Sequence, residues 1–256
     1  MTSDIVWQPL RAELARRAEA KDNVCLWLRD DDAVMPAAAL QTLVDLVGDF
    51  AVPIAVAAIP ARSSPALARF LQNASHATPV VHGWRHDNHA PATQKKQELG
   101  DHRPLDAVLS DLSVSLIRMT ELFGDRHVPM LVPPWNRISA SILPHLRELG
   151  YRALSCHGTV RADAPVPVFN THVDLIDWRA SRRSRDHASL VRDVVLHIRR
   201  AAPAGEPVGI LTHHLVHDAE AWTFLRGLFT VTRGFDCCRW LSVADLISGD
   251  KANSQN

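Results

Sequence analysis

Three consecutive aspartates, Asp30, Asp31 and Asp32, are the residues of this chain best suited to chemistry, and they follow the apolar run 24–28. Adjacent carboxylates repel one another, and each costs several kcal/mol to desolvate when it has no partner. A cation or a catalytic task would offset that cost at the end of a buried strand. The alternative interpretation is a solvated turn that caps a helix, because Pro36 and an Ala/Leu-rich stretch come next.

Two histidines supply partners for a cation. His82 and His86 have i, i+4 spacing, which in a helical turn places both imidazoles on one face. Two imidazoles and one carboxylate, with positions left open for water and substrate, are typical of catalytic zinc sites. An accidental pair is the alternative in a chain with 14 histidines, and His213 and His217 repeat the same spacing.

Strand and helix patterns alternate along nearly the whole chain, which predicts parallel βα units in one sheet or barrel. The expected strands are 24–28, 53–59, 79–81, 129–132, 151–155, 166–170 and 208–211, and the expected helices are 9–20, 37–47, 65–71, 105–123, 139–149, 187–200, 219–228 and a last one capped by Ser242. With about seven strands, a closed or nearly closed barrel is favoured over a small open sheet. We expect a single domain over residues 1–256, with an N-terminal helix at 9–20 and a flexible C-terminal tail at 249–256.

Polar residues follow five of the predicted strands. They are Asp30, Asp31 and Asp32 after the first, His82 and His86 after the third, Trp135, Asn136 and Arg137 after the fourth, His172 and Asp174 after the sixth, and His213 and His214 after the seventh. Because ligands bind at the carboxyl ends of parallel strands, we expect these groups to crowd at one rim.

Bulk composition excludes several classes of protein. Lys+Arg and Asp+Glu both number 28, so no net charge attracts the chain to nucleic acid or to anionic lipid. The longest apolar run, 51–61, is too short to span a bilayer, and the first residues lack the layout of a signal peptide. The four cysteines form no CxxC pair and suit a reducing compartment. These features predict a cytoplasmic protein.

The motifs together resemble those of the polysaccharide deacetylase family, whose NodB-homology domain is a distorted (β/α) barrel of metal-dependent carbohydrate deacetylases. The family's first motif, Thr-Phe-Asp-Asp-Gly-Pro, is similar to the stretch around Asp31, Asp32 and Ala33. The resemblance implies that Asp31 is the general base and Asp32 a metal ligand. A shift by one residue, to Asp30 and Asp31, stays open.

Two further motifs match in chain order. The family's His-Ser/Thr-x-x-His motif resembles His82-Gly83-Trp84-Arg85-His86, which implies that both histidines bind the metal. Its strand ending in histidine resembles residues 210–213, which implies that His213 is the general acid. Asp174 or Asp177, just before Trp178, would take the family's supporting acidic role.

The third motif departs from the family's pattern. The usual Arg-Pro-Pro-Tyr/Trp, whose arginine orients the catalytic aspartate, appears here as Val132-Pro133-Pro134-Trp135. Arg29 or Arg137 is a candidate substitute for the missing arginine. The departure bears on mechanism and substrate class more than on the fold.

Several other residues near the motifs are candidates for substrate binding or support. Trp84, Trp135 and Trp178 could stack on sugar rings or pack in the core, and His172 and His214 could orient metal ligands or catalytic groups.

The resemblance implies a metal-dependent hydrolase that removes acetyl groups from an N-acetylated sugar, an oligosaccharide or a related intermediate. It would use one divalent metal, zinc by preference, with cobalt or nickel as alternatives. The partner is then a small-molecule or oligosaccharide substrate, with no nucleic acid and no membrane, and the oligomeric state stays open. The alternatives are a C–N hydrolase of non-sugar amides on the same site, and a non-catalytic protein that binds metal or sugar.

Overall fold

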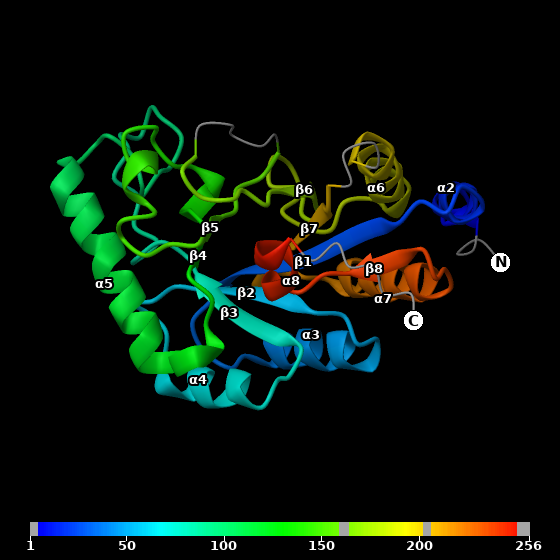
Figure 1. The fold of residues 1–256 in the computed structure, drawn as a ribbon, viewed down its shortest axis with the longest axis horizontal. Coiled ribbons are helices and arrows are strands. Elements are labelled where there is room, and N and C mark those ends of the chain that lie inside the picture. Colours follow the sequence, from blue (N-terminus) through cyan, green and yellow to red (C-terminus); the bar gives the residue numbers. More distant parts are fainter. Residues whose placement is uncertain (1–4, 159–163, 202–205, 250–256) are drawn as a thin grey trace. The chain divides into compact units, whose positions relative to one another are not determined.

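Strands and helices alternate through the computed structural model, which describes residues 5–158, 164–201 and 206–249 (Figure 1). The elements are α2 (Gln8–Glu19), β1 (Val24–Ala33), α3 (Ala38–Asp49), β2 (Ile54–Ala58), α4 (Pro65–Gln72), β3 (Ala77–Val81), α5 (Leu105–Phe123), η1 (Gly124–Arg126), β4 (Met130–Leu131), η2 (Pro134–Asn136), η3 (Leu143–His145), β5 (Ala153–Leu154), β6 (Thr171–Asp174), α6 (His187–Ala201), β7 (Val208–Thr212), η5 (His214–Val216), α7 (Ala219–Arg233), β8 (Cys238–Trp240) and α8 (Val243–Ser248), where η marks a 3₁₀ turn.

The contacts divide the chain into two compact units. Unit 1 comprises Met1–Asp30, Ala38–Ile54 and Thr171–Asn256, and unit 2 comprises Asp31–Ala37 and Ala55–Asn170. The boundary between Asp30 and Asp31 therefore falls inside the aspartate triplet. The expectation of a single domain stays a prediction, and residues 250–256 of the expected tail lie outside the described residues.

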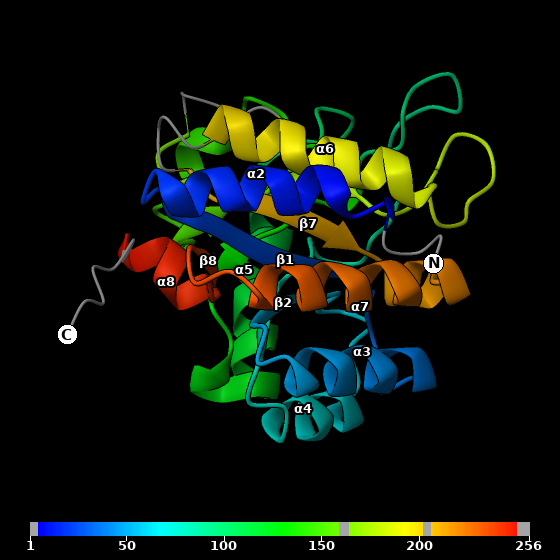
Figure 2. The same ribbon diagram turned by 90° about the vertical axis from the view of Figure 1, so that its right-hand side faces the viewer.

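Parallel strands form the centre of unit 1. β1 pairs with β7 from Leu26↔Val208 to Asp30↔Thr212, β7 pairs with β6, and β8 pairs with the first residues of β1, all in parallel. Figure 2 shows α2 and α6 side by side, with α7 on the other side of β1. In this register, Asp30, the last residue of β1 that belongs to unit 1, lies beside Thr212 at the end of β7.

Unit 2 brings the ends of its strands to a common edge. The strand order is β2-β3-β4-β5, and β3, β4 and β5 pair in parallel. Beyond the strands the ladder continues, because Ile59 N donates to Ala33 O at 3.0 Å, His82 N to Ala58 O at 2.9 Å and Val132 N to Val81 O at 2.7 Å. The residues that follow β2, β3 and β4 are therefore each held beside the end of the preceding strand.

Local sequence accounts for the best-defined elements. Every residue of β2 is buried, as expected for an apolar run covered on both faces. Ser64 caps α4 by accepting the Leu67 N–H, and Ser242 forms a capping box with Asp245 at the start of α8. The expected helices at 9–20, 105–123 and 187–200 agree with α2, α5 and α6 to within about one residue at each end.

β1 is longer than predicted. The apolar run was expected to end the strand at residue 28, but the strand continues through the aspartates to Ala33, and Arg29, Asp30 and Asp31 are all buried. Asp30 pairs with β7 in register with Thr212, so the sheet itself positions the first carboxylate. The carboxylates are therefore part of the strand and not of a solvated turn after it.

The helix expected at 139–149 is wrong. This segment holds only turns and the short η3, because Pro144 has no N–H to donate and fixes φ. Ser139 and Ser141 instead donate their hydroxyls to Asp101, and Ser139 N donates to Leu99 O at 2.8 Å. These distant contacts replace helical hydrogen bonds.

One predicted short strand is also wrong, and another short strand was not predicted. The strand expected at 166–170 is reduced to a single bridge between Leu154 and Val168, because Pro165 and Pro167 cannot donate to a ladder. The strand begins instead at Thr171. The half-buried β8 was not expected from its sequence, Cys238-Arg239-Trp240.

None of the helices in the described ranges is long and apolar enough to cross a membrane.

A buried ion-pair cluster joins α2 to α6 in unit 1. Glu13 accepts hydrogen bonds from Arg16 at 2.6 Å, from Arg17 at 3.0 Å and from Arg199 of α6 at 2.9 Å. Burial alone raises the pKa of Glu13, but the bonds from the three guanidinium groups outweigh it and lower the pKa to about 2. The ionised carboxylate is therefore the form that stabilises the contact between the two helices.

Replacing Glu13 with Gln should lower the free energy of unfolding by about 1–3 kcal/mol near neutral pH, because the arginines lose a shared charged acceptor. The pKa of Glu13 lies below its ordinary 4.5 in the folded state, so its contribution is complete above that value and is lost as the pH falls through about 2. Urea denaturation of parent and variant at about pH 7 and about pH 3 checks this. An equal difference at both values would contradict the assignment.

Candidate functional site

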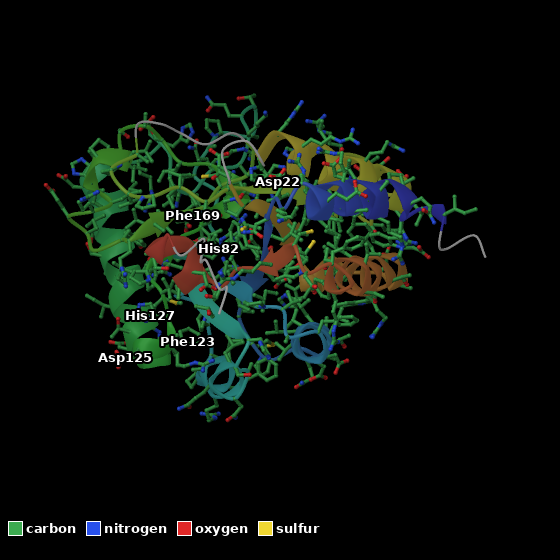
Figure 3. All side chains as sticks on the ribbon, turned by 45° about the vertical axis from the view of Figure 1, so that its right-hand side comes forward. Asp22, His82, Phe123, Asp125, His127 and Phe169 are labelled. Carbon is green, nitrogen blue, oxygen red and sulfur yellow. The ribbon has the colours of Figure 1, made fainter. Side chains whose placement is uncertain are left out.

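Asp32, His82 and His86 converge in unit 2. Oδ1 of Asp32 lies 3.1 Å from Nε2 of His82 and 3.2 Å from Nε2 of His86. One ligand atom from each residue lies within 4.8 Å of the other two. Figure 3 shows His82 inside the molecule, and its side chain is nearly fully buried, whereas Asp32 and His86 are partly exposed. The three side chains form a candidate metal centre that is open to solvent on one side.

The backbone after β4 orients the first imidazole. Nδ1 of His82 lies 2.9 Å from the carbonyl oxygen of Val132, and a carbonyl can only accept, so Nδ1 carries the proton. Neutral His82 then presents the lone pair of Nε2 to Asp32. Such a fixed tautomer, with the second ring nitrogen bound to a carbonyl, is usual for metal-binding histidines.

Electrostatics favour a cation between these groups. Burial disfavours the imidazolium form and His82 adds to the effect, so the pKa of His86 falls to about 4 even though Asp32 opposes the shift. His86 is thus neutral near pH 7. In their neutral forms, the two imidazoles and the carboxylate oxygen that they face are all electron donors, and this donor set fits a divalent metal such as zinc.

The loop between the two histidines is not the helical turn that was expected. Gly83 and His86 both have positive φ, 58° and 60°, and residues 82–86 form an irregular loop. The loop is held by Glu98, a buried carboxylate that accepts the backbone N–H groups of Trp84 and Arg85. Sequence reasoning missed Glu98, because an acidic residue in a polar connecting segment has no periodic or motif signal.

Trp135 lies against the imidazole of His86. Its ring centroid is 4.3 Å from that of His86, and its φ of 55° lies in the left-handed region. Asn136 follows with φ of 58°, and Arg137 donates from Nη1 to the carbonyl oxygen of Lys96 at 2.6 Å. Trp84 lies in the histidine loop, with the Arg85 guanidinium 5.5 Å from its ring. The four candidates near the second and third motifs therefore lie in or beside this loop region of unit 2.

Asp30 is fully engaged within unit 1. Its Oδ1 accepts the Thr212 hydroxyl at 2.7 Å and the His214 backbone N–H at 2.8 Å, and its Oδ2 lies 2.5 Å from Nδ1 of His214. Complete burial raises the pKa of Asp30, but the charge of His214 and these hydrogen bonds outweigh it and lower the pKa. Both oxygens of Asp30 are thus occupied, Asp31 is also buried, and the choice of Asp31 as the general base stays a prediction.

His213 lies beside Trp178 in unit 1. The two rings meet edge to face at 4.7 Å, and Nε1 of Trp178 donates to Oδ2 of Asp174 at 2.8 Å. Asp174 therefore orients the indole. Asp177 instead accepts the backbone N–H groups of residues 179–181, which lowers its pKa. Of the two candidates for the supporting acid, Asp174 binds Trp178, whose ring contacts His213. Asp177 instead binds the backbone of the turn that follows it.

His172 has a different environment from the other candidates. Its Nδ1 accepts the backbone N–H of Gly209 at 3.0 Å, near the start of β7, and its ring lies 5.0 Å from that of His197 on α6. His172 thus contacts β7 and α6.

Arg29, one suggested substitute for the missing arginine, is completely buried.

Comparisons with known proteins were made on sequence and on structure. No protein-family model matches the sequence, and no curated protein matches it. Solved structures do match. A Mycobacterium smegmatis protein assigned as a polysaccharide deacetylase is 13% identical, with a TM-score of 0.69 and 92% of each chain covered.

The fold is that of the polysaccharide deacetylases. Puue allantoinase is also similar, with 12% identity and a TM-score of 0.63 over 91% of this chain and 92% of that one. A family 4 acetyl xylan esterase from Clostridium thermocellum, solved with a cobalt ion, is 13% identical with a TM-score of 0.52, covering 88% and 91%. At these identities the likeness confirms the expected α/β fold class, the distorted (β/α) barrel, and the family resemblance at the level of the fold.

The two adjacent aspartates at the unit boundary should respond differently to amidation. Asp30→Asn should lower the free energy of unfolding by about 3–5 kcal/mol, because it removes the buried carboxylate that binds His214. The NH₂ group of the new amide would also face a hydrogen-bond donor in place of an acceptor. Asp31→Asn should lower the free energy by less, because it leaves the hydrogen bonds of Asp30 in place and removes one of three neighbouring like charges. Urea denaturation of the three proteins measures this, and an equal loss in both variants would contradict it.

Proposed function

We propose that this protein is a metal-dependent hydrolase that removes acetyl groups from an N-acetylated sugar, an oligosaccharide or a related intermediate. The observation that carries the proposal is the donor set of Asp32, His82 and His86, with Nε2 of each imidazole about 3 Å from one carboxylate oxygen. A fold shared with polysaccharide deacetylases supports the same conclusion.

The three donors would hold one divalent cation. We propose zinc, with cobalt or nickel as alternatives, and the cobalt ion in the similar acetyl xylan esterase supports a metal of this class. When bound, such a cation polarises the carbonyl that is attacked and lowers the pKa of water. His82 contributes a tautomer already set by Val132 O, so little reorganisation would accompany binding.

The remaining steps belong to side chains of this chain. Asp31 would accept the proton of the attacking water, since Asp30 is occupied by Thr212 and His214. His213 would donate a proton to the leaving nitrogen, because an amide nitrogen does not depart as an anion at neutral pH. Both roles come from the family resemblance. Trp135, packed on His86, offers an aromatic face of the kind that stacks on sugar rings.

A second candidate function is hydrolysis of a cyclic, non-sugar amide. The similarity to Puue allantoinase, with a TM-score of 0.63, favours it. A protein that binds metal or sugar without catalysis is the third possibility, and Val132 in place of the arginine that orients the family's catalytic aspartate suggests it. Location in the cytoplasm stays a prediction from the sequence.

Metal content and product release, measured together, test the proposal. Purified parent protein should contain about one divalent metal and release acetate from some member of a panel of N-acetylated amino sugars and their oligomers. Asp31→Asn should keep the metal and lose about a hundred- to ten-thousandfold in turnover, because it removes the proton acceptor. His82→Ala should lose both metal and turnover, because it removes a ligand.

The matched control is His127→Ala, a histidine near the end of α5 that bonds to Gly124 O, outside the three-donor cluster (Figure 3). It should keep both metal and turnover. Opening of allantoin without acetate release would establish the second candidate instead. Bound metal with no turnover on either class of substrate would favour the non-catalytic alternative, and a parent that binds no metal would overturn the proposal.

A further inference from the structure

Glu98 is a buried carboxylate with an unusual set of partners in unit 2. Its Oε1 accepts the backbone N–H groups of Arg85 at 2.7 Å and Asp87 at 3.3 Å, and its Oε2 accepts that of Trp84 at 3.1 Å. The residue is only 2% exposed. In the described part of the chain, no lysine or arginine forms an ion pair with it, so backbone donors stabilise its charge.

The loop that carries the metal-binding histidines has no secondary structure of its own to satisfy these donors. Gly83 and His86 have φ of 58° and 60°, and the N–H groups of Trp84, Arg85 and Asp87 all donate to one carboxylate. An N–H group that is withdrawn from water without an acceptor destabilises the folded state. One carboxylate removes that cost for three donors, and it can do so only while the loop keeps this conformation.

Gly83 shows how closely Glu98 approaches the loop. A Cβ atom at position 83 would lie 2.1 Å from Oε2 of Glu98 and 2.6 Å from Cδ of Pro134, so no side chain fits there. The polysaccharide deacetylase motif has Ser or Thr at this position. In this chain, the space that such a side chain would occupy is taken by the carboxylate of Glu98 and the ring of Pro134.

Both Glu98 and the loop are anchored on their far sides. Leu99 forms a parallel bridge with Ile138, and Gln97 N donates to the side chain of Asn88 at 2.9 Å, so the backbone on either side of Glu98 is fixed. On the loop, the hydroxyl of Ser115 from α5 donates to the carbonyl oxygen of Gly83 at 2.9 Å. The loop is thus held from two directions by groups that are themselves held in place.

We propose that Glu98 is a positioning residue for the metal centre, which binds the backbone of residues 84–87 and thereby sets the separation of the His82 and His86 imidazoles. The inference rests on the proposed function for the identity of the ligands. Glu98 touches neither imidazole in the described contacts, so it acts through the backbone of the loop. Its substitution should change affinity for metal more than it changes the stability of the fold.

The test is zinc affinity of the full-length, metal-free protein, measured by competition with a chromophoric chelator. Glu98→Gln preserves size but turns an NH₂ group toward a backbone N–H, so the dissociation constant for zinc should rise about tenfold to a hundredfold. Glu98→Asp keeps the charge but shortens the side chain by one methylene, so it should raise the zinc dissociation constant less than Glu98→Gln does. This second variant decides the matter if the first does not fold.

Glu13→Gln is the matched control, because Glu13 is also a buried glutamate with three donors but lies in unit 1. It should lower the melting temperature at least as much as Glu98→Gln does and leave the zinc dissociation constant unchanged. A Glu98→Gln protein with the zinc affinity of the parent would overturn this inference alone. A parent that binds neither zinc, cobalt nor nickel would overturn the proposed function and this inference with it.

Discussion

A carboxylate buried in the middle of a sheet needs partners for its charge, and Asp30 is the clearest case in this chain. It meets a hydroxyl, a backbone N–H and an imidazole, all from the residues at the end of β7 and just after it. Because a carboxylate without such partners costs several kcal/mol to bury, these groups must be in place for β1 to continue through Asp30. Asp32 is partly exposed, and the Nε2 atoms of two imidazoles from the loop after β3 face it as electron donors, so the proposed cation would be its partner.

Backbone groups orient much of the candidate centre. Val132 holds His82 through its carbonyl oxygen, and Glu98 holds the histidine loop through three N–H groups. The strength of such a hydrogen bond hardly depends on the type of residue that supplies the backbone atom. It depends instead on where the backbone lies, so the sheet that positions residues 82 and 132 contributes energetically to the candidate metal centre.

The difference between local sequence patterns and contacts with distant backbone atoms explains what could be predicted from the sequence. Long helices such as α5 and the fully apolar β2 follow from periodicity and composition, which are local properties. The pairing of Asp32 with His82 and His86 followed from residue type and spacing together with the family's motif order. The conformation of the loop did not, since i, i+4 spacing suggested a helical turn and the positive φ of Gly83 depends on a carboxylate fifteen positions further along.

Other failures have the same physical origin. The segment 139–149 has apolar residues at helical spacing, but Pro144 and the hydroxyl bonds to Asp101 outweigh that pattern. Glu98 lay in a polar stretch that predicted only a connection. Both cases involve hydrogen bonds between residues distant in the sequence, and neither periodicity nor composition reports on such bonds.

Val132 shows how a departure from the family's motif can leave the metal centre unaltered. The family's arginine acts through its side chain, whereas the bond to His82 at this position comes from the carbonyl oxygen, which valine supplies as well as arginine does. Val132 is fully buried, and the hydrogen bond of its own N–H to Val81 O keeps that carbonyl in line with the sheet. The substitution therefore preserves the orientation of His82 while it removes a positive charge. In the proposed mechanism, its consequence should fall on Asp31 as the proton acceptor and on the charge of the substrate, and not on the binding of the metal.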